Sequence, residues 1–372
     1  MTVAKENMTV YKKAQRKIFN PTEAEIKEYS ATYAYCCASF HVLLENLENK
    51  DYFKSFQKVL LNQATAKYER TNLEVVDKID TSFMNKLPDE GFILCSFHFS
   101  AYQIISPLLI KKNRKYFIVV NNSDSNNQDT IEKNIKGFKS AKKRYKNTVQ
   151  ENIIHLYTNE KDFVFRARDL LNDGYVMLVF IDGNSGLDGI MKSSNKNLEK
   201  ISFLQREIFV RKGIPILSYS FKVPIIPIFS IRDQDNQSAN IFISDPIIPD
   251  LSLSRDQYCN RTIKYLYNLL EQYVKSNPFD WEGWLYIYKW LDIKSLQVKN
   301  SFSVKKIFNS LEFNTSKYIK FQINENYFLL DKDTHLSYEI DIITYNKLEG
   351  ILDTTSISAD DLEELKEMKI LI

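Results

Sequence analysis

The residues best suited to chemistry in this 372-residue chain are one histidine and the polar residues near it. His98 follows a short apolar run, and Gln103 stands about one helical turn further along, within reach of a ring nitrogen. A histidine fixed by a neighbouring acceptor is the minimal general base for a hydroxyl or amine attacking an acyl carbonyl. A lone histidine after a strand is more often structural, so its surroundings decide between the two interpretations.

Other kinds of catalytic site are not indicated. No two of the four histidines are spaced as a helical metal pair, and the four cysteines form no CxxC motif. Gly183, Gly186 and Gly189 have the wrong spacing for a dinucleotide loop, and no GxxxxGK motif occurs. The chemistry must therefore depend on isolated histidines, carboxylates or hydroxyls.

The composition limits the partners and the location. Fifty Lys and Arg against 47 Asp and Glu leave a net charge of +3, which does not favour nucleic acid as a ligand. The cysteines are predicted to be free thiols in a reducing compartment. Residues 1–20 do not resemble a signal peptide, and the apolar runs at 92–95 and 175–181 are too short to cross a membrane. We therefore expect a cytoplasmic protein that can still touch a membrane surface.

Strands alternating with helices predict the fold class. Residues 21–85 have helical spacing, residues 163–171 predict a helix that stops at Asn172-Asp173-Gly174, and residues 255–276 predict a long helix. Buried strands are predicted at 91–97, 116–120, 153–157 and 175–181, with further apolar segments at 214–220 and 225–231. This pattern indicates an α/β fold with a mixed, largely parallel sheet flanked by helices.

In such a sheet the ligand site lies at the carboxyl ends of the strands. The polar residues expected there are His98, Asn121, Asn122, Thr158 and Asp182. The aromatic cluster at 281–290, which holds all three tryptophans, is predicted to be a packed cap over the core; a ligand-stacking platform is the less favoured alternative.

The C-terminal part has a different character. Strands are predicted at 327–331 and 336–342, and short helices at 345–352 and 359–368, with His335 in a structural turn. These elements indicate a small α+β, winged-helix-like accessory domain. The predicted organisation is a helical region at 1–85, a core at 86–295 and the accessory domain at 300–372.

Five motifs in order resemble a known family. They are His98-x4-Gln103, Phe180-Ile181-Asp182, Phe203-Leu204-Gln205-Arg206, Val223-Pro224-Ile225-Ile226-Pro227 and Pro278-x2-Trp281. Residues from about 30 to 291 resemble the late acyltransferases of bacterial lipid A biosynthesis, members of the lysophospholipid acyltransferase superfamily. The resemblance implies a glycerolipid acyltransferase-like core and transfer of an acyl group from acyl-carrier protein or acyl-CoA to a hydroxyl or amine.

The resemblance also implies roles for individual residues. His98 would be the general base with Gln103 beside it, and Asp182 and Ser185 would lie in a substrate-binding loop across from the histidine. Arg206 would hold a phosphate or pantetheine, which suits a guanidinium; an ordinary surface arginine is the alternative. No cofactor is implied beyond the acyl-ACP or acyl-CoA donor.

Two departures from the family leave alternatives open. Gln103 stands where the family has a carboxylate, so either the base is weaker or the protein is a degenerate acyltransferase fold that binds a lipid, a carrier protein or a peptide partner. The family's N-terminal membrane anchor is also not found, so the acceptor need not be a membrane lipid. An esterase with Ser185 as nucleophile is disfavoured because Leu187 takes the place of the last glycine of GxSxG.

Two basic runs flank the predicted core. Their residues are Lys111, Lys112 and Arg114, and then Lys142, Lys143 and Arg144. A solvated helix face is the simpler interpretation, and docking of an acidic carrier protein or of the anionic inner membrane surface is the functional one. Residues 327–372 loosely resemble peptide-recognition domains of peptide-modifying enzymes, which would make the acceptor a peptide or specialised metabolite.

Overall fold

The computed structural model divides into two compact units. It describes residues 3–44, 46–120, 127–183, 197–233, 238–291, 301–302, 311–315, 317–323, 326–332, 337–348, 351–352, 367–368 and 370. The first unit comprises Met1–Asn20, Gln57–Phe203 and Phe209–Gly283, and the second comprises Pro21–Phe56, Leu204–Ile208 and Trp284–Ile372. These units interleave along the chain, so they do not map one to one onto the three consecutive predicted regions, which stay a prediction.

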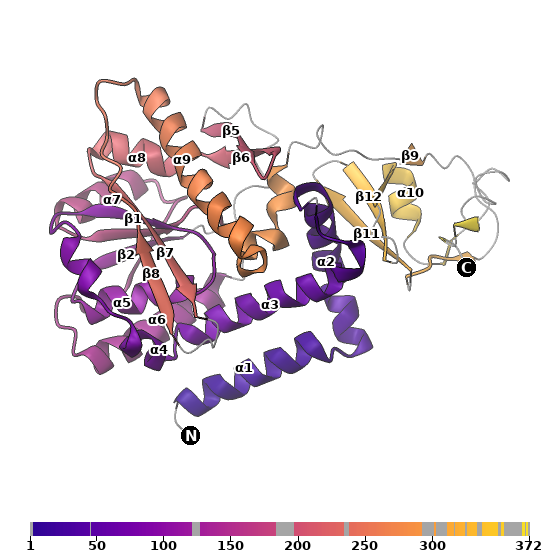
Figure 1. The fold of residues 1–372 in the computed structure, drawn as a ribbon, viewed down its shortest axis with the longest axis horizontal. Helices are drawn as coiled ribbons and strands as arrows, with labels where there is room; N and C mark the ends of the chain where they lie inside the picture. Colours follow the sequence, from indigo (N-terminus) through magenta and orange to yellow (C-terminus); the bar gives the residue numbers. More distant parts are fainter. Residues whose placement is uncertain are drawn as a thin grey trace. The chain divides into compact units, whose positions relative to one another are not determined.

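The first unit is built on a six-stranded sheet with the order β3-β2-β4-β1-β7-β8. Figure 1 labels β1, β2, β7 and β8 of this sheet. In chain order its strands are β1 (Phe92–Ser96), β2 (Tyr116–Val120), β3 (Ile154–Tyr157), β4 (Val176–Phe180), β7 (Ile225–Arg232) and β8 (Ala239–Ile243). Neighbouring strands pair in parallel except for β8, which is antiparallel to β7. The predicted α/β class with a mixed, largely parallel sheet is confirmed.

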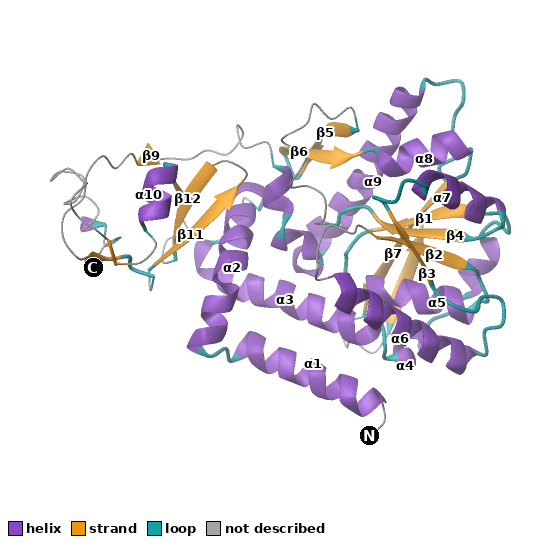
Figure 2. Cartoon of the chain, turned by 180° about the vertical axis from the view of Figure 1, so that it is seen from behind, coloured by secondary structure: helices purple, strands orange, loops and turns teal. Residues whose placement is uncertain are grey.

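Helices cover both faces of this sheet (Figure 2). On one face lie α4 (Leu73–Lys78), α5 (Ile105–Lys111) and α6 (Asn127–Tyr145), and on the other lie α7 (Phe163–Asn172), α8 (Gly213–Phe221) and α9 (Arg255–Ser276). Because both faces are covered, β1 is buried along its whole length. That burial is why the predicted strands appear in the sequence as nearly continuous apolar runs.

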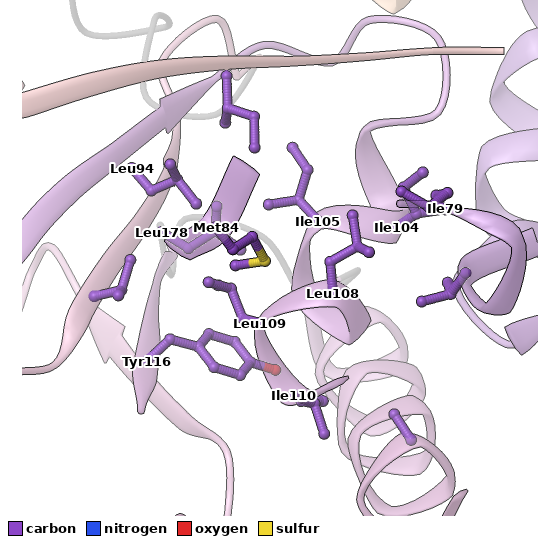
Figure 3. Packing of buried hydrophobic residues seen from close by; sticks show 14 of the residues in the cluster. Ile79, Met84, Leu94, Ile104, Ile105, Leu108, Leu109, Ile110, Tyr116 and Leu178 are labelled. Carbon is purple, nitrogen blue, oxygen red and sulfur yellow. The ribbon is translucent and has the colours of Figure 1, made fainter. Parts of the chain in front are cut away.

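Buried side chains of the central strands β1 and β4 point to both covered faces of the sheet. Leu94 and Leu178 pack with Leu108 and Leu109 of α5 on the first face (Figure 3). Past the end of β1, Phe97 stacks on Phe229 of β7 at 5.5 Å between ring centroids, and it meets Tyr267 of α9 edge-on. The central strands are therefore held from both sides, which gives a rigid base to the residues at their carboxyl ends.

Two glycines fix the entries to the central strands, as the sequence suggests. A Cβ at Gly91 would lie 1.9 Å from the carbonyl oxygen of Leu171, so the strand and helix α7 can approach only without a side chain here. Gly174 has φ +78° after the end of α7, the left-handed conformation that stops a helix.

Three further elements complete this part of the chain. The apolar run at 214–220 forms helix α8, because a short apolar run fits a buried helix as well as a strand. Strand β8 was not predicted, and its residues alternate in exposure as expected for an edge strand. The hairpin of β5 (Leu198–Phe203) and β6 (Arg206–Arg211) turns through Leu204 and Gln205, both with positive φ.

Helices dominate the N-terminal part, as predicted. They are α1 (Val3–Phe19), α2 (Glu23–Leu43) and α3 (Tyr52–Glu69), with one-turn 3-10 helices η1 (Asn49–Asp51) and η2 (Ser82–Lys86). Helix α2 begins with a capping box in which Thr22 accepts from Glu25 N and Glu25 accepts from Thr22 N. Helix α1 packs within the first unit, where Tyr11 stacks on Tyr68 and its hydroxyl bonds with Thr65.

The second unit contains a smaller sheet with the order β11-β12-β13-β9. Its elements are β9 (Ser301–Phe302), β11 (Tyr318–Ile323), β12 (Asn326–Asp331), β13 (Ser337–Ile340) and helix α10 (Ile342–Lys347), beside a separate pair, β10 (Leu311–Glu312) with β14 (Ile351–Leu352). The predicted strands at 327–331 and 336–342 match β12 and β13, whereas β11 was missed. His335 and residues 359–366 of the predicted last helix lie outside the described residues.

The tryptophan-rich segment is built from 3-10 turns, namely η4 (Pro278–Asp280), η5 (Glu282–Leu285) and η6 (Ile287–Trp290). Trp281, Trp284 and Trp290 are all buried. Trp281 packs on Phe203 in the first unit, and Trp284 packs on Phe40 in the second. The burial of these three rings agrees with the predicted packed cap, because a ligand-stacking platform would need exposed rings.

Candidate active site

His98 and Asp182 lie side by side because of the register of two strands. Strand β1 pairs in parallel with β4, and Ser96 stands opposite Phe180 at their carboxyl ends. His98 and Asp182 each follow two positions after these residues, so the same register brings the two side chains together. The site is thus at the carboxyl edge of the central strands, where ligands bind in parallel sheets.

Asp182 holds both the ring and the backbone of His98. Its Oδ1 lies 2.8 Å from His98 Nδ1, and the backbone N–H of His98 donates to both carboxylate oxygens at 3.0 Å. Trp281 Nε1 donates to Oδ2 at 2.8 Å. Asp182 is fully buried, whereas the His98 side chain is 23% exposed. Asp182 therefore orients His98 with its proton on Nδ1 and leaves Nε2 as the atom able to accept a proton.

The electrostatics favour the protonated ring. Burial lowers the pKa of His98, but the charge of Asp182, its hydrogen bond and a smaller effect of Glu282 outweigh burial, so the pKa is raised above its ordinary value. A buried carboxylate next to an imidazole stabilises the imidazolium that forms when a general base takes its proton. Asp182 is thus placed to stabilise the protonated form of His98 that arises only after the neutral ring has accepted a proton.

The loop that follows His98 is fixed by a buried ion pair. Ser100 has φ 52°, and its backbone N–H donates to Asp280 O at 2.7 Å. Arg232 at the end of β7 donates from Nη2 to Ser100 O at 2.7 Å and from its backbone N–H to Ser100 Oγ at 3.0 Å. Its guanidinium also contacts Glu69 through two hydrogen bonds of 2.6 and 2.8 Å. The Arg232–Glu69 ion pair therefore holds Ser100, two positions after His98, in its left-handed backbone conformation.

A second polar group lies next to the histidine. The Tyr102 ring meets the His98 ring at 4.9 Å between centroids, and the Tyr102 side chain interacts with both Gln103 and Glu282. Glu282 is buried, donates its backbone N–H to His98 O at 2.9 Å, and accepts from Gln63 Nε2 at 3.2 Å. Burial raises the pKa of Glu282, an effect that His98 opposes.

Two site residues make contacts that the sequence did not predict. Gln103 was expected within reach of a ring nitrogen of His98, whereas the partner of Nδ1 is Asp182. Half-buried Gln103, in the 3-10 turn η3 (Tyr102–Ile104), interacts with Tyr102. Asp182, expected to bind substrate, is wholly enclosed and bonded to His98 and Trp281, so it orients the histidine. Both differences follow from strand pairing that sequence spacing does not show.

The other predicted substrate residues are Ser185 and Arg206. Ser185, like Asn121 and Asn122, lies outside the described residues. Arg206 belongs to the second unit, where its Nε donates to Val42 O at 3.2 Å. The nearest part of the glycine loop that is described is Gly183, where an added Cβ would lie 3.8 Å from His98 Cε1.

The predicted docking cations are largely used within the fold. Lys111 donates to carbonyls at the end of α4, and Lys112 contacts Asn85. Arg114 donates to the carbonyls of Leu87 and Pro88, Lys142 donates to Glu151 O, and Arg144 pairs with Asp77. Lys143 is exposed. Most of these residues thus have structural partners that favour the simpler interpretation, and docking stays a prediction.

Residues that sequence reasoning missed complete the site. They are Glu69, Tyr102, Arg232, Trp281 as a donor to Asp182, and Glu282. Two of them could have been found in the sequence. Arg232 is a charged residue at the end of a buried strand, and Glu282 is a charged residue among aromatic residues. A charge in either position is buried and needs a partner.

The described part of the chain shows neither a metal site nor a membrane span. It contains no group of three His, Cys, Asp or Glu side chains able to hold a metal ion together. Within the same ranges no helix has the length and apolar character to cross a bilayer. In sequence comparisons, no protein-family model and no curated protein matches this chain.

Proposed function

We propose that the protein is an acyltransferase that moves a fatty acyl group from acyl-carrier protein or acyl-CoA to a hydroxyl or amine. The acceptor would be a lipid, a peptide or a specialised metabolite. The observation that carries this proposal is the contact of 2.8 Å between His98 Nδ1 and the buried carboxylate of Asp182, at the carboxyl edge of a parallel sheet. A partly exposed histidine oriented in this way is suited to act as a general base.

In the proposed reaction, His98 Nε2 removes the proton from the acceptor as the acceptor's lone pair forms a bond to the thioester carbonyl carbon. Asp182 stabilises the resulting imidazolium. When the carbon–sulfur bond breaks, the imidazolium returns its proton to the leaving thiolate, and the products are an ester or amide and a free thiol. Positioned proton transfer of this kind is worth about 10²- to 10⁴-fold in rate.

The resemblance to lipid A late acyltransferases supports the same function. Its weak point was Gln103, which supplies no charge where that family has a carboxylate. Asp182 removes much of this objection, because it gives the ring a charged partner from another strand. We accordingly infer a glycerolipid acyltransferase-like core and a cytoplasmic enzyme that acts at, or close to, the inner membrane surface.

The C-terminal sheet carries a second part of the proposal. Strands β11, β12 and β13 form an antiparallel sheet followed by α10, and their core contains Tyr318, Leu329 and Ile340. These elements fit the winged-helix-like accessory domain inferred from the sequence. In this proposal the domain recruits a peptide or protein partner and brings the acceptor to the enzyme.

The test is thioester cleavage by the purified full-length protein. Octanoyl, dodecanoyl and hexadecanoyl thioesters of CoA and of acyl-carrier protein are offered with a lysophospholipid and a primary amine, and thiol release is followed with a thiol reagent. We expect release with the wild-type protein and none above background with His98→Ala. Binding of the thioester without His98-dependent release would instead favour a degenerate, binding-only protein.

A further inference from the structure

The segment around Glu282 is bound closely to the His98 loop. Its backbone N–H donates to His98 O at 2.9 Å, and Asp280 O accepts from Ser100 N at 2.7 Å. Phe99 and Trp281 form an antiparallel bridge, and the Trp281 indole donates to Asp182. Glu282 is therefore positioned by the same contacts that position the histidine and its carboxylate.

The side chain of Glu282 is only partly satisfied by hydrogen bonds. It is 4% exposed, Oε2 accepts from Gln63 Nε2 at 3.2 Å, and Oε1 is buried without a hydrogen-bond partner among the described residues. Glu69, another buried carboxylate in the same unit, is instead paired by two hydrogen bonds with Arg232. A buried carboxylate without such a pair is costly, so the groups around Glu282 decide how its charge is compensated.

The electrostatic partner of Glu282 is His98. Glu282 helps to raise the pKa of His98, and His98 opposes the rise that burial imposes on the pKa of Glu282. The other groups that bear on Glu282 are Lys67, Gln63 and Tyr102, and the other group that raises the pKa of His98 is Asp182. Tyr102 contacts His98 through its ring and interacts with Glu282 as well.

We propose that Glu282 is a second carboxylate of the His98 centre, a positioning residue whose negative charge acts with Asp182 to stabilise the protonated ring. This role depends on the proposed acyl transfer, during which His98 is transiently an imidazolium. Glu282 supplies a negative charge near Tyr102 and Gln103. Gln103 is the residue that stands where the resembling family has a carboxylate. Glu282 does not need to touch the substrate to act in this way.

The test is the pKa of His98, measured by NMR on full-length protein with ¹³C-labelled histidine, with the signal assigned by its loss in His98→Ala. We expect Glu282→Gln to lower this pKa by about 0.5 to 1 unit. The matched control Glu199→Gln removes a carboxylate that pairs with Lys212 and Lys264, and it should leave the pKa unchanged. Glu282→Asp, which keeps the charge, should stay near the wild-type value.

The thioester assay provides a separate readout. The same pKa change predicts that Glu282→Gln has a kcat lower by about three- to tenfold and a KM close to wild type. An unchanged His98 pKa in folded Glu282→Gln protein would overturn the proposal. If Glu282→Gln does not fold, Glu282→Asp is measured in its place. A His98 pKa that falls by about 0.5 to 1 unit in Glu282→Asp, although the negative charge is kept, would overturn the proposal as well. A lowered pKa without any wild-type thioester cleavage would support the role of Glu282 toward His98 and refute the proposed function.

Discussion

Replacement of Asp182 by asparagine tests the proposed catalytic pair of His98 and Asp182 most sharply. Asparagine has nearly the same shape but no charge, and it offers one acceptor oxygen where the carboxylate offers two. In the wild-type protein the carboxylate accepts from His98 N, His98 Nδ1 and Trp281 Nε1, all at 2.8 to 3.0 Å. At least one of these buried donors must therefore lose its acceptor and face the amide NH₂ group.

The expected magnitude follows from these contacts. A hydrogen bond to a charged group contributes about 1.5 to 3 kcal/mol, and a buried donor left unpaired costs about 1 to 3 kcal/mol. If about 3 to 4 kcal/mol of the stabilisation of the imidazolium is lost, kcat falls by about 10²- to 10³-fold. The pKa of His98 should fall in the same variant, because its main charged partner is gone.

The assay is thiol release from an acyl thioester at saturating donor, with thermal unfolding measured on the same samples. Asp162→Asn is the control, since Asp162 has an exposed carboxyl at the start of α7. Asp182→Asn protein that keeps a folded transition but retains kcat within about threefold of wild type, while His98→Ala is inactive, would refute the role given to Asp182.

Four further predictions follow from the same contacts. Because the pKa of His98 is raised, its neutral form appears only at higher pH, so kcat/KM should rise with pH through a midpoint above the ordinary value of about 6.5; a midpoint below it would contradict the account. By linkage, the stability of wild type relative to His98→Ala should be greatest below pH about 6.5 and decline as the pH rises through the folded pKa, as measured by denaturant titration at several pH values. Glu69→Gln leaves Arg232 buried without its charged partner and should lower the unfolding free energy by about 3 to 5 kcal/mol in urea; a loss below about 1 kcal/mol would contradict the clamp. Gln103→Glu should retain or raise thioester cleavage, and its inactivation would show that position 103 needs an amide.

The sequence carried enough information for the fold class and for half of the site. Central strands such as β1 and β4 are buried on both faces, so their apolar runs are easy to recognise. The position of His98 past the end of a strand, with Asp182 past the end of another, was also visible. What could not be predicted is that β4 lies beside β1, because β2 and β3 come between them in the chain.

The remaining site residues depend on long-range contacts. Glu69 and Arg232 pair across 163 positions, and Glu282 reaches His98 from a 3-10 turn after the longest helix of the first unit. No local pattern distinguishes these charges from surface residues before the fold is known. The partner of the His98 ring has the same origin. Helical spacing suggested Gln103, whereas the bond to Nδ1 comes from Asp182, two residues past the end of β4.

The central claim is that His98, oriented by Asp182, acts as the general base in the transfer of an acyl group. The most direct measurement uses a ¹³C-labelled hexadecanoyl thioester of acyl-carrier protein, incubated with the full-length protein and a small-molecule and lipid extract, and follows the label by mass spectrometry. The account predicts label in a new ester or amide with wild-type protein, strongly reduced label with Asp182→Asn and none with His98→Ala. Equal labelling by wild-type and His98→Ala protein, or no labelled product with any of them, would contradict it.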